Sequence, residues 1–224
     1  MMIIGGFAKN SLIDFPGTIA CVVFTQGCNF KCPYCHNPDL VAGPVKDSGH
    51  LYDEVQILKF LAKRKGLLEG VTITGGEPTL QNDLILFCKK IKEMGYRIKM
   101  DTNGTRPRVL ASLFKEDLLD YVAMDIKTCP DGYAGVWQGR SEPELISQSV
   151  NLIKELAKDY EFRTTCVRPF VTEQPMKQMV QLIKAAKKHI LQQCAGDVEV
   201  LDPDFLIKSD RLYAPAVMET LQKI

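Results

Sequence analysis

Three cysteines, Cys28, Cys32 and Cys35, fall within eight residues of the sequence. Core packing does not explain three thiols this close together, and their C-x3-C-x2-C spacing can place three thiolates around a metal centre. A zinc ion would take a fourth ligand, for which His36 and His50 are the candidates. An iron–sulfur cluster would instead keep one iron open for a ligand that is not protein. The cysteine spacing alone leaves both metals open.

A glycine pair followed by an acidic residue and a proline comes directly after a short apolar run. Gly75 and Gly76 allow the backbone to approach a ligand closely or to adopt a positive φ. Glu77 supplies a carboxylate, and Pro78 stiffens the turn. Such a loop suits a ligand that carries an ammonium group. A structural zinc site has no use for this loop, so the combination favours the iron–sulfur cluster.

Charged residues end two further apolar runs. Asp101 and Asp125 can hold a cation or a polar ligand between them, and Lys127 can pair with a ligand carboxylate. Together with the cysteines and the glycine loop, they indicate a site for a small charged molecule beside a metal centre.

The elements that must position these residues follow from the apolar periodicity, in which short β-branched runs alternate with longer amphipathic segments. The predicted strands cover residues 19–25, 71–74, 97–101, 121–126, 161–167 and 197–201. The predicted helices cover residues 51–64, 82–94, 107–118, 144–158 and 174–191.

Strict alternation of strands and helices favours a parallel sheet with helical crossovers. Six repeats fit an α/β fold of the incomplete (β/α)6 TIM-like barrel type, and a doubly wound open sheet is the alternative. In either architecture the loops at the carboxyl ends of the strands meet on one face. The cysteines, the glycine loop and the charged strand ends are therefore expected to lie together.

Composition excludes several classes of partner. Lys and Arg number 28 against 27 Asp and Glu, which leaves no surplus charge for a nucleic acid backbone. No run of about 18 apolar residues could span a bilayer, so a cytoplasmic protein is expected. No linker or shift in composition divides the chain, and we expect a single domain over residues 1–224. The remaining cysteines are scattered singly, which indicates buried hydrophobes and no auxiliary cluster: Cys21, Cys88, Cys129, Cys166 and Cys194.

Four motifs in this order resemble one known superfamily: CNFKCPYC (28–35), GGEP (75–78), DTNG (101–104) and DIK (125–127). They resemble the radical S-adenosylmethionine (SAM) enzymes, and among these the activating enzymes of glycyl radical enzymes. The stretch KNSLIDFPGTIACVVFTQGCNFKCPYCHNPDLV looks most like the short activating enzymes of anaerobic ribonucleoside-triphosphate reductase. The pyruvate formate-lyase activating enzymes are similar.

The resemblance implies a 4Fe–4S cluster held by Cys28, Cys32 and Cys35, with SAM bound through its amino and carboxylate groups to the open iron. One electron would cleave SAM into methionine and a 5′-deoxyadenosyl radical, which would take a hydrogen atom from a glycine of a partner protein. In this chemistry the cofactors carry the reaction, and no protein acid or base is obligatory.

The resemblance also implies a role for further residues. The loop from Gly75 through Gly76 and Glu77 to Pro78 would bind the methionine ammonium. The backbone of Tyr34 and His36 would contact the adenine. Asp101, Thr102 and Asp125 would bind a monovalent cation and the SAM carboxylate region. Lys127 would lie at that carboxylate, and Arg163 near the cofactor.

The implied partner is a glycyl radical enzyme, with anaerobic ribonucleotide reductase favoured, and the implied electron donor is a flavodoxin or a ferredoxin-type protein. Two alternatives stay open. The partner can be pyruvate formate-lyase or another glycyl radical enzyme, or the substrate can be a small molecule, as for the 7-carboxy-7-deazaguanine synthases.

Overall fold

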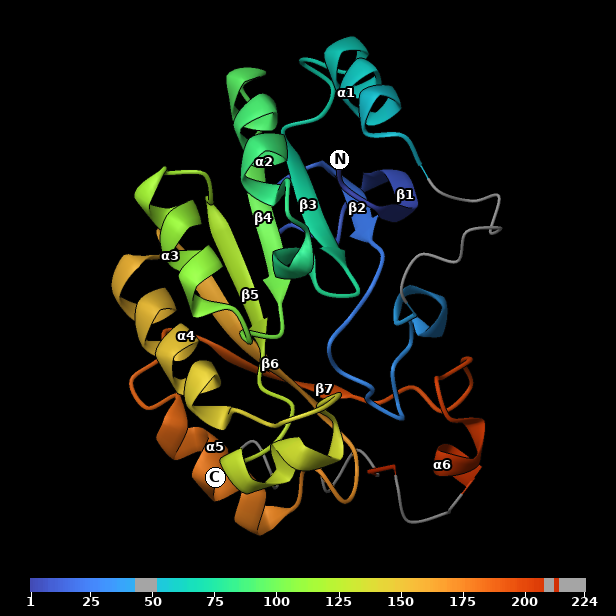
Figure 1. Ribbon diagram of the computed structural model, residues 1–224, viewed down its shortest axis with the longest axis vertical. Coiled ribbons are helices and arrows are strands. Elements are labelled where there is room, and N and C mark those ends of the chain that lie inside the picture. Colours follow the sequence, from blue (N-terminus) through green and yellow to red (C-terminus); the bar gives the residue numbers. More distant parts are fainter. Residues whose placement is uncertain (43–51, 208–211, 214–224) are drawn as a thin grey trace.

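A computed structural model describes residues 1–42, 52–207 and 212–213 (Figure 1). Seven strands form one sheet in which each strand pairs with its neighbours in sequence, so β1 and β7 are the two edges. The strands are β1 (Ile4–Ser11), β2 (Ala20–Thr25), β3 (Gly70–Gly75), β4 (Arg97–Thr102), β5 (Tyr121–Asp125), β6 (Tyr160–Cys166) and β7 (His189–Gln193). The pairs from β2 to β7 are parallel, which confirms the predicted α/β sheet, and β1 is antiparallel to β2.

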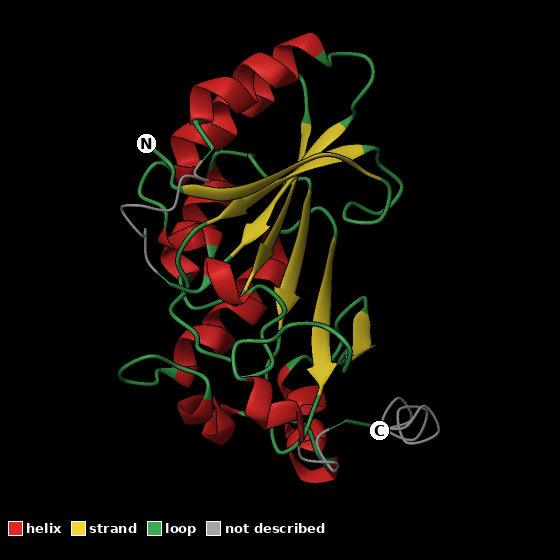
Figure 2. Ribbon diagram, turned by 90° about the vertical axis from the view of Figure 1, so that its right-hand side faces the viewer, coloured by secondary structure: helices red, strands yellow, loops and turns green. Residues whose placement is uncertain are grey.

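Five helices lie along one side of the curved sheet (Figure 2). They are α1 (Glu54–Lys63), α2 (Leu84–Glu93), α3 (Pro107–Lys115), α4 (Pro143–Leu156) and α5 (Glu173–Leu182). The short α6 (Pro203–Ile207) lies apart from them (Figure 1). Each of the five longer helices corresponds to a predicted one; the ends of α1 to α4 differ by at most three residues, whereas α5 ends well before residue 191. Proline in the first turn begins α3 and α4, where its missing N–H costs no hydrogen bond. Among the described residues, no helix is both long and apolar enough to cross a membrane.

The core lies between this side of the sheet and the helices. Ile73, Ile98, Val122 and Met124 are fully buried there, and the apolar faces of α2, α3 and α4 pack against them. The opposite face of the sheet carries a different kind of residue. Thr72, Thr74, Lys99, Asp101, Asp125 and Arg163 alternate with the apolar positions along β3 to β6. This alternation places polar side chains on the side of the sheet away from the helices.

The prediction for the last strand and helix was wrong. Residues 197–201 form no strand, and β7 lies at His189–Gln193, where it overlaps residues 189–191 of the predicted helix 174–191. The helix ends at Leu182, and Ala185 takes a positive φ of 61°, which breaks the helical path. Instead of pairing with a strand, the N–H groups of Leu201 and Asp202 donate to Cys35 O and Pro33 O.

The strand β1 was not predicted at all. Its sequence, IGGFAKNS, has two glycines and a polar end, so it lacks the apolar run that marks the other strands. It forms as an edge strand because β2 supplies an antiparallel partner, with Phe7 opposite Val23 and Ala8 opposite Val22.

Candidate active site

The carboxyl ends of the parallel strands surround a cavity of about 440 Å³. All but one of the predicted site residues line this cavity. Those that line it are Cys28, Cys32, Tyr34, Cys35, His36, Gly75, Gly76, Glu77, Asp101, Thr102, Asp125, Lys127 and Arg163. The exception, Pro78, is buried behind Glu77 at the start of a short 3-10 helix. The topology therefore brings together residues that are up to 135 positions apart in the chain, as expected for parallel strands.

The cysteine loop follows β2 and is held by a second segment of the chain. Lys31 N–H donates to Val136 O at 2.6 Å, and the Gln138 side chain donates to the carbonyl oxygens of Cys28 and Phe30, both at 3.1 Å. The Phe30 ring packs edge-on against Trp137, with centroids 5.0 Å apart. These contacts hold the cysteine loop in place.

The thiols lie in surroundings that oppose their ionisation. Burial raises the pKa of Cys28 to about 12 and that of Cys32 to about 11. Thiolates at these positions therefore need a cationic partner, which the irons of a cluster supply.

A buried polar group beside the cysteines also fits a bound cofactor. The Tyr34 side chain is 3% exposed, and its hydroxyl is the one buried side-chain nitrogen or oxygen in the described residues without a hydrogen-bond partner. Such groups are costly unless something else satisfies them. The aromatic rings of Phe170 and Phe205 pack around Tyr34, with centroids 5.6 and 6.4 Å away.

The zinc alternative finds less support. The His36 ring lies with Nε2 3.7 Å from the Cys194 sulfur, a partner that the sequence did not indicate. His50, the other candidate ligand, lies outside the described residues. Within the described part of the chain, no three His, Cys, Asp or Glu side chains converge on one point at metal-binding distance.

The two glycines allow β3 and its loop to lie directly against the β2 loop. Gly75 has a φ of 118°, and a Cβ there would collide with the backbone of Thr25. A Cβ on Gly76 would collide with the carbonyl group of Gly27. Gly76 N–H donates to Thr25 O and Glu77 N–H to Gly27 O, both at 2.8 Å. These contacts bring the glycine loop next to the cysteine loop.

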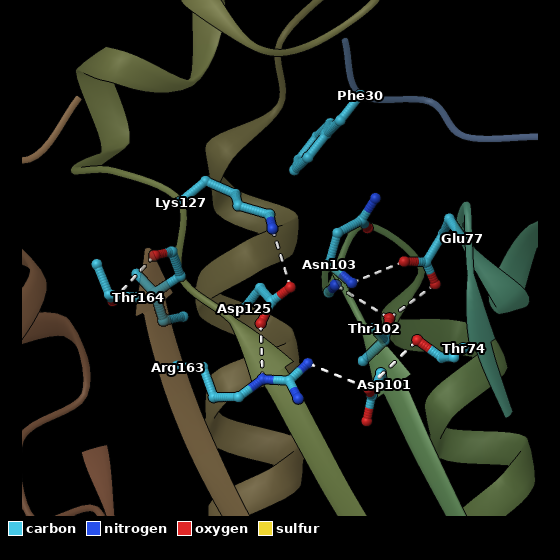
Figure 3. A network of polar contacts seen from close by, with 12 residues as sticks. Phe30, Thr74, Glu77, Asp101, Thr102, Asn103, Asp125, Lys127, Arg163 and Thr164 are labelled. Atoms are coloured by element: carbon cyan, nitrogen blue, oxygen red, sulfur yellow. Dashed lines mark hydrogen bonds and ion pairs between the residues drawn. The ribbon is translucent and has the colours of Figure 1, made fainter. Parts of the chain in front are cut away.

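The Glu77 carboxylate joins the glycine loop to the loop after β4. It is fully buried and accepts hydrogen bonds from the N–H and the hydroxyl of Thr79. It also accepts from the Thr102 hydroxyl at 2.7 Å and from Asn103 N–H at 2.6 Å (Figure 3). Burial raises its pKa, and these hydrogen bonds act in the opposite direction. The sequence suggested a carboxylate directed at a ligand, whereas the structure shows a carboxylate that already has internal donors.

Four charged side chains form the polar wall of the cavity (Figure 3): Asp101, Asp125, Lys127 and Arg163. Arg163 bridges the two aspartates, with Nε 2.9 Å from Asp125 Oδ1 and Nη2 3.3 Å from Asp101 Oδ2. Lys127 Nζ lies 2.9 Å from Asp125 Oδ2, and Lys99 contacts Asp101. Burial opposes the ionised form of Asp125, but Arg163 and Lys127 outweigh it and hold the pKa of that carboxyl well below its usual range.

Of the charged side chains that line the cavity, Lys127 and Arg163 are basic and Asp14, Glu77, Asp101 and Asp125 are acidic, so the cavity carries no excess of positive charge. Lys127 is nevertheless a basic group that can meet a ligand carboxylate, because few waters compete for a partly buried positive charge. Lys99 was missed in the sequence, although a lysine between Ile98 and Met100 in a buried strand was the available signal.

Comparison with known proteins identifies the family. The sequence profile of the Radical SAM superfamily matches residues 22–183. The chain belongs to this superfamily. Radical SAM enzymes use a 4Fe–4S cluster and SAM, so these are its cofactors. It is an enzyme of the radical SAM oxidoreductase type.

Relatives within the superfamily give a finer comparison. A protein of Methanocaldococcus jannaschii, provisionally named as a glycyl-radical enzyme activating enzyme, is 34% identical over 197 residues, which is 85% of this chain and 79% of that protein. The pyruvate formate-lyase-activating enzyme of Clostridium pasteurianum is 38% identical over 130 residues. That match spans 54% of this chain and about half (51%) of the relative.

A solved structure with S-adenosylmethionine bound shares the fold. SuiB of Streptococcus suis, bound to S-adenosylmethionine, superposes with a TM-score of 0.61 at 16% identity, over 88% of this chain and 44% of that one. The α/β fold expected from the alternation of strands and helices is confirmed, and the match of the family profile over residues 22–183 identifies it as the radical SAM core.

Proposed function

We propose that this enzyme activates a glycyl radical enzyme, by generating a radical on a glycine of that partner. The observation that carries the proposal is the single cavity in which the cysteine loop, the glycine loop and the charged wall meet. The relative from M. jannaschii, with its similarity over 79% of its own length, supports the same class of activity.

The cluster ligands in this proposal are Cys28, Cys32 and Cys35. Burial disfavours free thiolates at Cys28 and Cys32, and the contacts from Val136 and Gln138 hold the loop in place. When bound, the cluster and SAM supply the one-electron cleavage and the radical that removes the hydrogen atom from glycine.

The other side chains bind and orient SAM. Lys127 pairs with the SAM carboxylate, and Arg163 keeps Asp101 and Asp125 in place beside it. Gly75 and Gly76 present their backbone to the methionine ammonium. Glu77 acts through the loops that it joins.

The remaining contacts follow the family pattern. The backbone of Tyr34 and His36 meets the adenine, and the aromatic rings around Tyr34 exclude water from that side of the cavity. A monovalent cation binds beside Asp101, Thr102 and Asp125. Arg163, Lys127 and Lys99 already contact all four oxygen atoms of the two carboxylates, so this cation would have to share an oxygen with one of these side chains.

The favoured partner is anaerobic ribonucleotide reductase, because the stretch around the cysteine loop looks most like its activating enzymes. Pyruvate formate-lyase is the second candidate, supported by several pyruvate formate-lyase-activating enzymes that are 33–38% identical over about half of this chain. A flavodoxin or a ferredoxin-type protein supplies the electron.

The test is electron paramagnetic resonance (EPR) on anaerobic, reconstituted and reduced protein, mixed with SAM and the reductase subunit from the same organism. A glycyl-radical doublet that requires SAM supports both the activity and the partner. If 5′-deoxyadenosine accumulates without a doublet, the partner is wrong, and pyruvate formate-lyase is tested next. If neither product appears in protein that carries its cluster, the proposed activity is refuted.

A further inference from the structure

Three polar side chains next to the cysteine loop form a closed ring of hydrogen bonds. Asn103 Nδ2 donates to Asn29 Oδ1 at 2.9 Å, Asn29 Nδ2 donates to Thr105 Oγ1 at 2.9 Å, and the Thr105 hydroxyl donates to Asn103 Oδ1 at 2.7 Å. Asn29 lies inside the cysteine loop, whereas Asn103 and Thr105 follow β4. The ring therefore connects the two loops through their side chains.

The ring fixes the orientation of the Asn103 amide. Asn103 Oδ1 also accepts a hydrogen bond from Thr105 N–H at 3.0 Å, so this atom must be the oxygen and the other must be the nitrogen. Asn103 and Thr105 are 5% and 2% exposed, so few waters can compete for these two side chains. The direction of the Nδ2 group is thus determined by its surroundings.

An amide nitrogen carries two hydrogens, and only one of them is used by the ring. The other faces Cys28, whose sulfur lies 4.0 Å from Asn103 Nδ2. The same sulfur accepts Phe30 N–H at 3.3 Å from within the loop. The Cys28 sulfur therefore has one hydrogen-bond donor in its own loop, Phe30 N–H. It has a second, longer contact with Asn103, which follows β4.

We infer that Asn103 donates a hydrogen bond to the Cys28 sulfur when that sulfur is a cluster ligand, and that this contact raises the reduction potential of the cluster. The inference rests on the proposed function, in which Cys28 binds iron. A thiolate is a stronger acceptor than a thiol, so the 4.0 Å contact is expected to shorten on cluster binding. Hydrogen bonds to cluster sulfurs stabilise the more negative, reduced state and tune the potential.

Asn103 is thus a positioning residue that acts through a cluster ligand. Its backbone N–H, which donates to Glu77, is separate from the amide and survives changes of the side chain. This separation allows the side chain to be tested while the junction of the two loops is preserved.

The experiment is an EPR-monitored redox titration of the reconstituted protein without SAM, on wild type, Asn103→Ala, Asn103→Asp and Thr105→Val. Both Asn103 variants lose the donor, so their midpoint potentials are expected to shift to more negative values, and further in Asn103→Asp, whose charge repels the thiolate. Thr105→Val breaks two bonds of the ring but leaves Thr105 N–H to orient Asn103, and its potential is expected to match that of wild type.

Three results would overturn the inference. The first is an unchanged potential in a fully loaded Asn103→Ala protein. The second is an equal shift in Thr105→Val, which would assign the effect to rigidity of the ring. The third is loss of the cluster from both Asn103 variants while Thr105→Val keeps its cluster. Asn103 would then be needed for assembly of the cluster and would not merely set its reduction potential. A parallel Cys28→Ala sample that retains an intact four-iron cluster would refute the ligand assignment itself, independently of Asn103.

Discussion

The substitution Asp125→Asn removes the central negative charge of the cavity wall while preserving its size. In the wild type, Asp125 accepts from Arg163 Nε through one oxygen and from Lys127 Nζ through the other, both at 2.9 Å. In the variant, the amide nitrogen must face one of these two donors. The change therefore places either Arg163 or Lys127 against the N–H group of the new amide in the variant. Both cations also lose the negative charge that Asp125 supplied.

The cost follows from the burial of the three groups. Breaking a fully buried ion pair costs about 3–5 kcal/mol. The side chains of Asp125, Arg163 and Lys127 are 26%, 17% and 18% exposed, so water recovers part of this loss. Asp101 also remains as a second partner for Arg163. We therefore expect the free energy of unfolding to fall by about 2 kcal/mol.

The assay is urea unfolding of the apoprotein at several pH values, with Glu173→Gln as control. Glu173 pairs with Lys177 on the exposed face of α5, and this control is expected to be close to wild type. Because the folded-state pKa of Asp125 is depressed, its contribution is present above roughly pH 4 and lost as the pH falls below that value. The difference between Asp125→Asn and wild type should shrink accordingly. An unchanged stability at pH 7, or a difference that grows on acidification, would refute the reasoning.

Three further substitutions test other parts of the site. Cys32→Ala should prevent assembly of an intact cluster, measured by iron content. Cys88→Ala, on the buried face of α2, should keep its iron and lower the free energy of unfolding by about 1 kcal/mol. Four irons in the Cys32 variant would disprove the role of Cys32 as a ligand. Gly76→Ala should lower the free energy of unfolding by about 2 kcal/mol and weaken SAM binding, because the added methyl group collides with the Gly27 carbonyl; a wild-type unfolding curve would show that the loops can move apart. Lys127→Met should weaken SAM binding about 10- to 100-fold in equilibrium dialysis, as expected for a lost charged hydrogen bond, and an unchanged dissociation constant would place the carboxylate elsewhere.

The sequence predicted those features whose signal is local. The cysteine spacing, the GGEP loop and the charged ends of β4 and β5 are each contained in a few consecutive residues, and parallel strands bring such loops to one face. The convergence of these residues on one site was therefore predictable from the sequence.

Features that depend on distant partners were not predictable in the same way. The strand β1 forms because β2 offers an edge, and residues 197–201 look like a strand yet contact the cysteine loop instead. The role of Glu77 depends on donors from Thr102 and Asn103, which only the fold brings within reach. The ring around Asn103 likewise joins residues 74 positions apart.

The central claim is that Cys28, Cys32 and Cys35 hold a cluster whose open iron binds SAM in this cavity. The most direct test is the EPR spectrum of the reduced, reconstituted protein before and after addition of SAM, together with its iron content. We predict four irons per chain and a reduced-cluster signal whose g values change when SAM is added, because SAM coordinates the cluster. A signal that SAM leaves unchanged in fully loaded protein, or zinc in place of iron in protein isolated anaerobically, would contradict the claim.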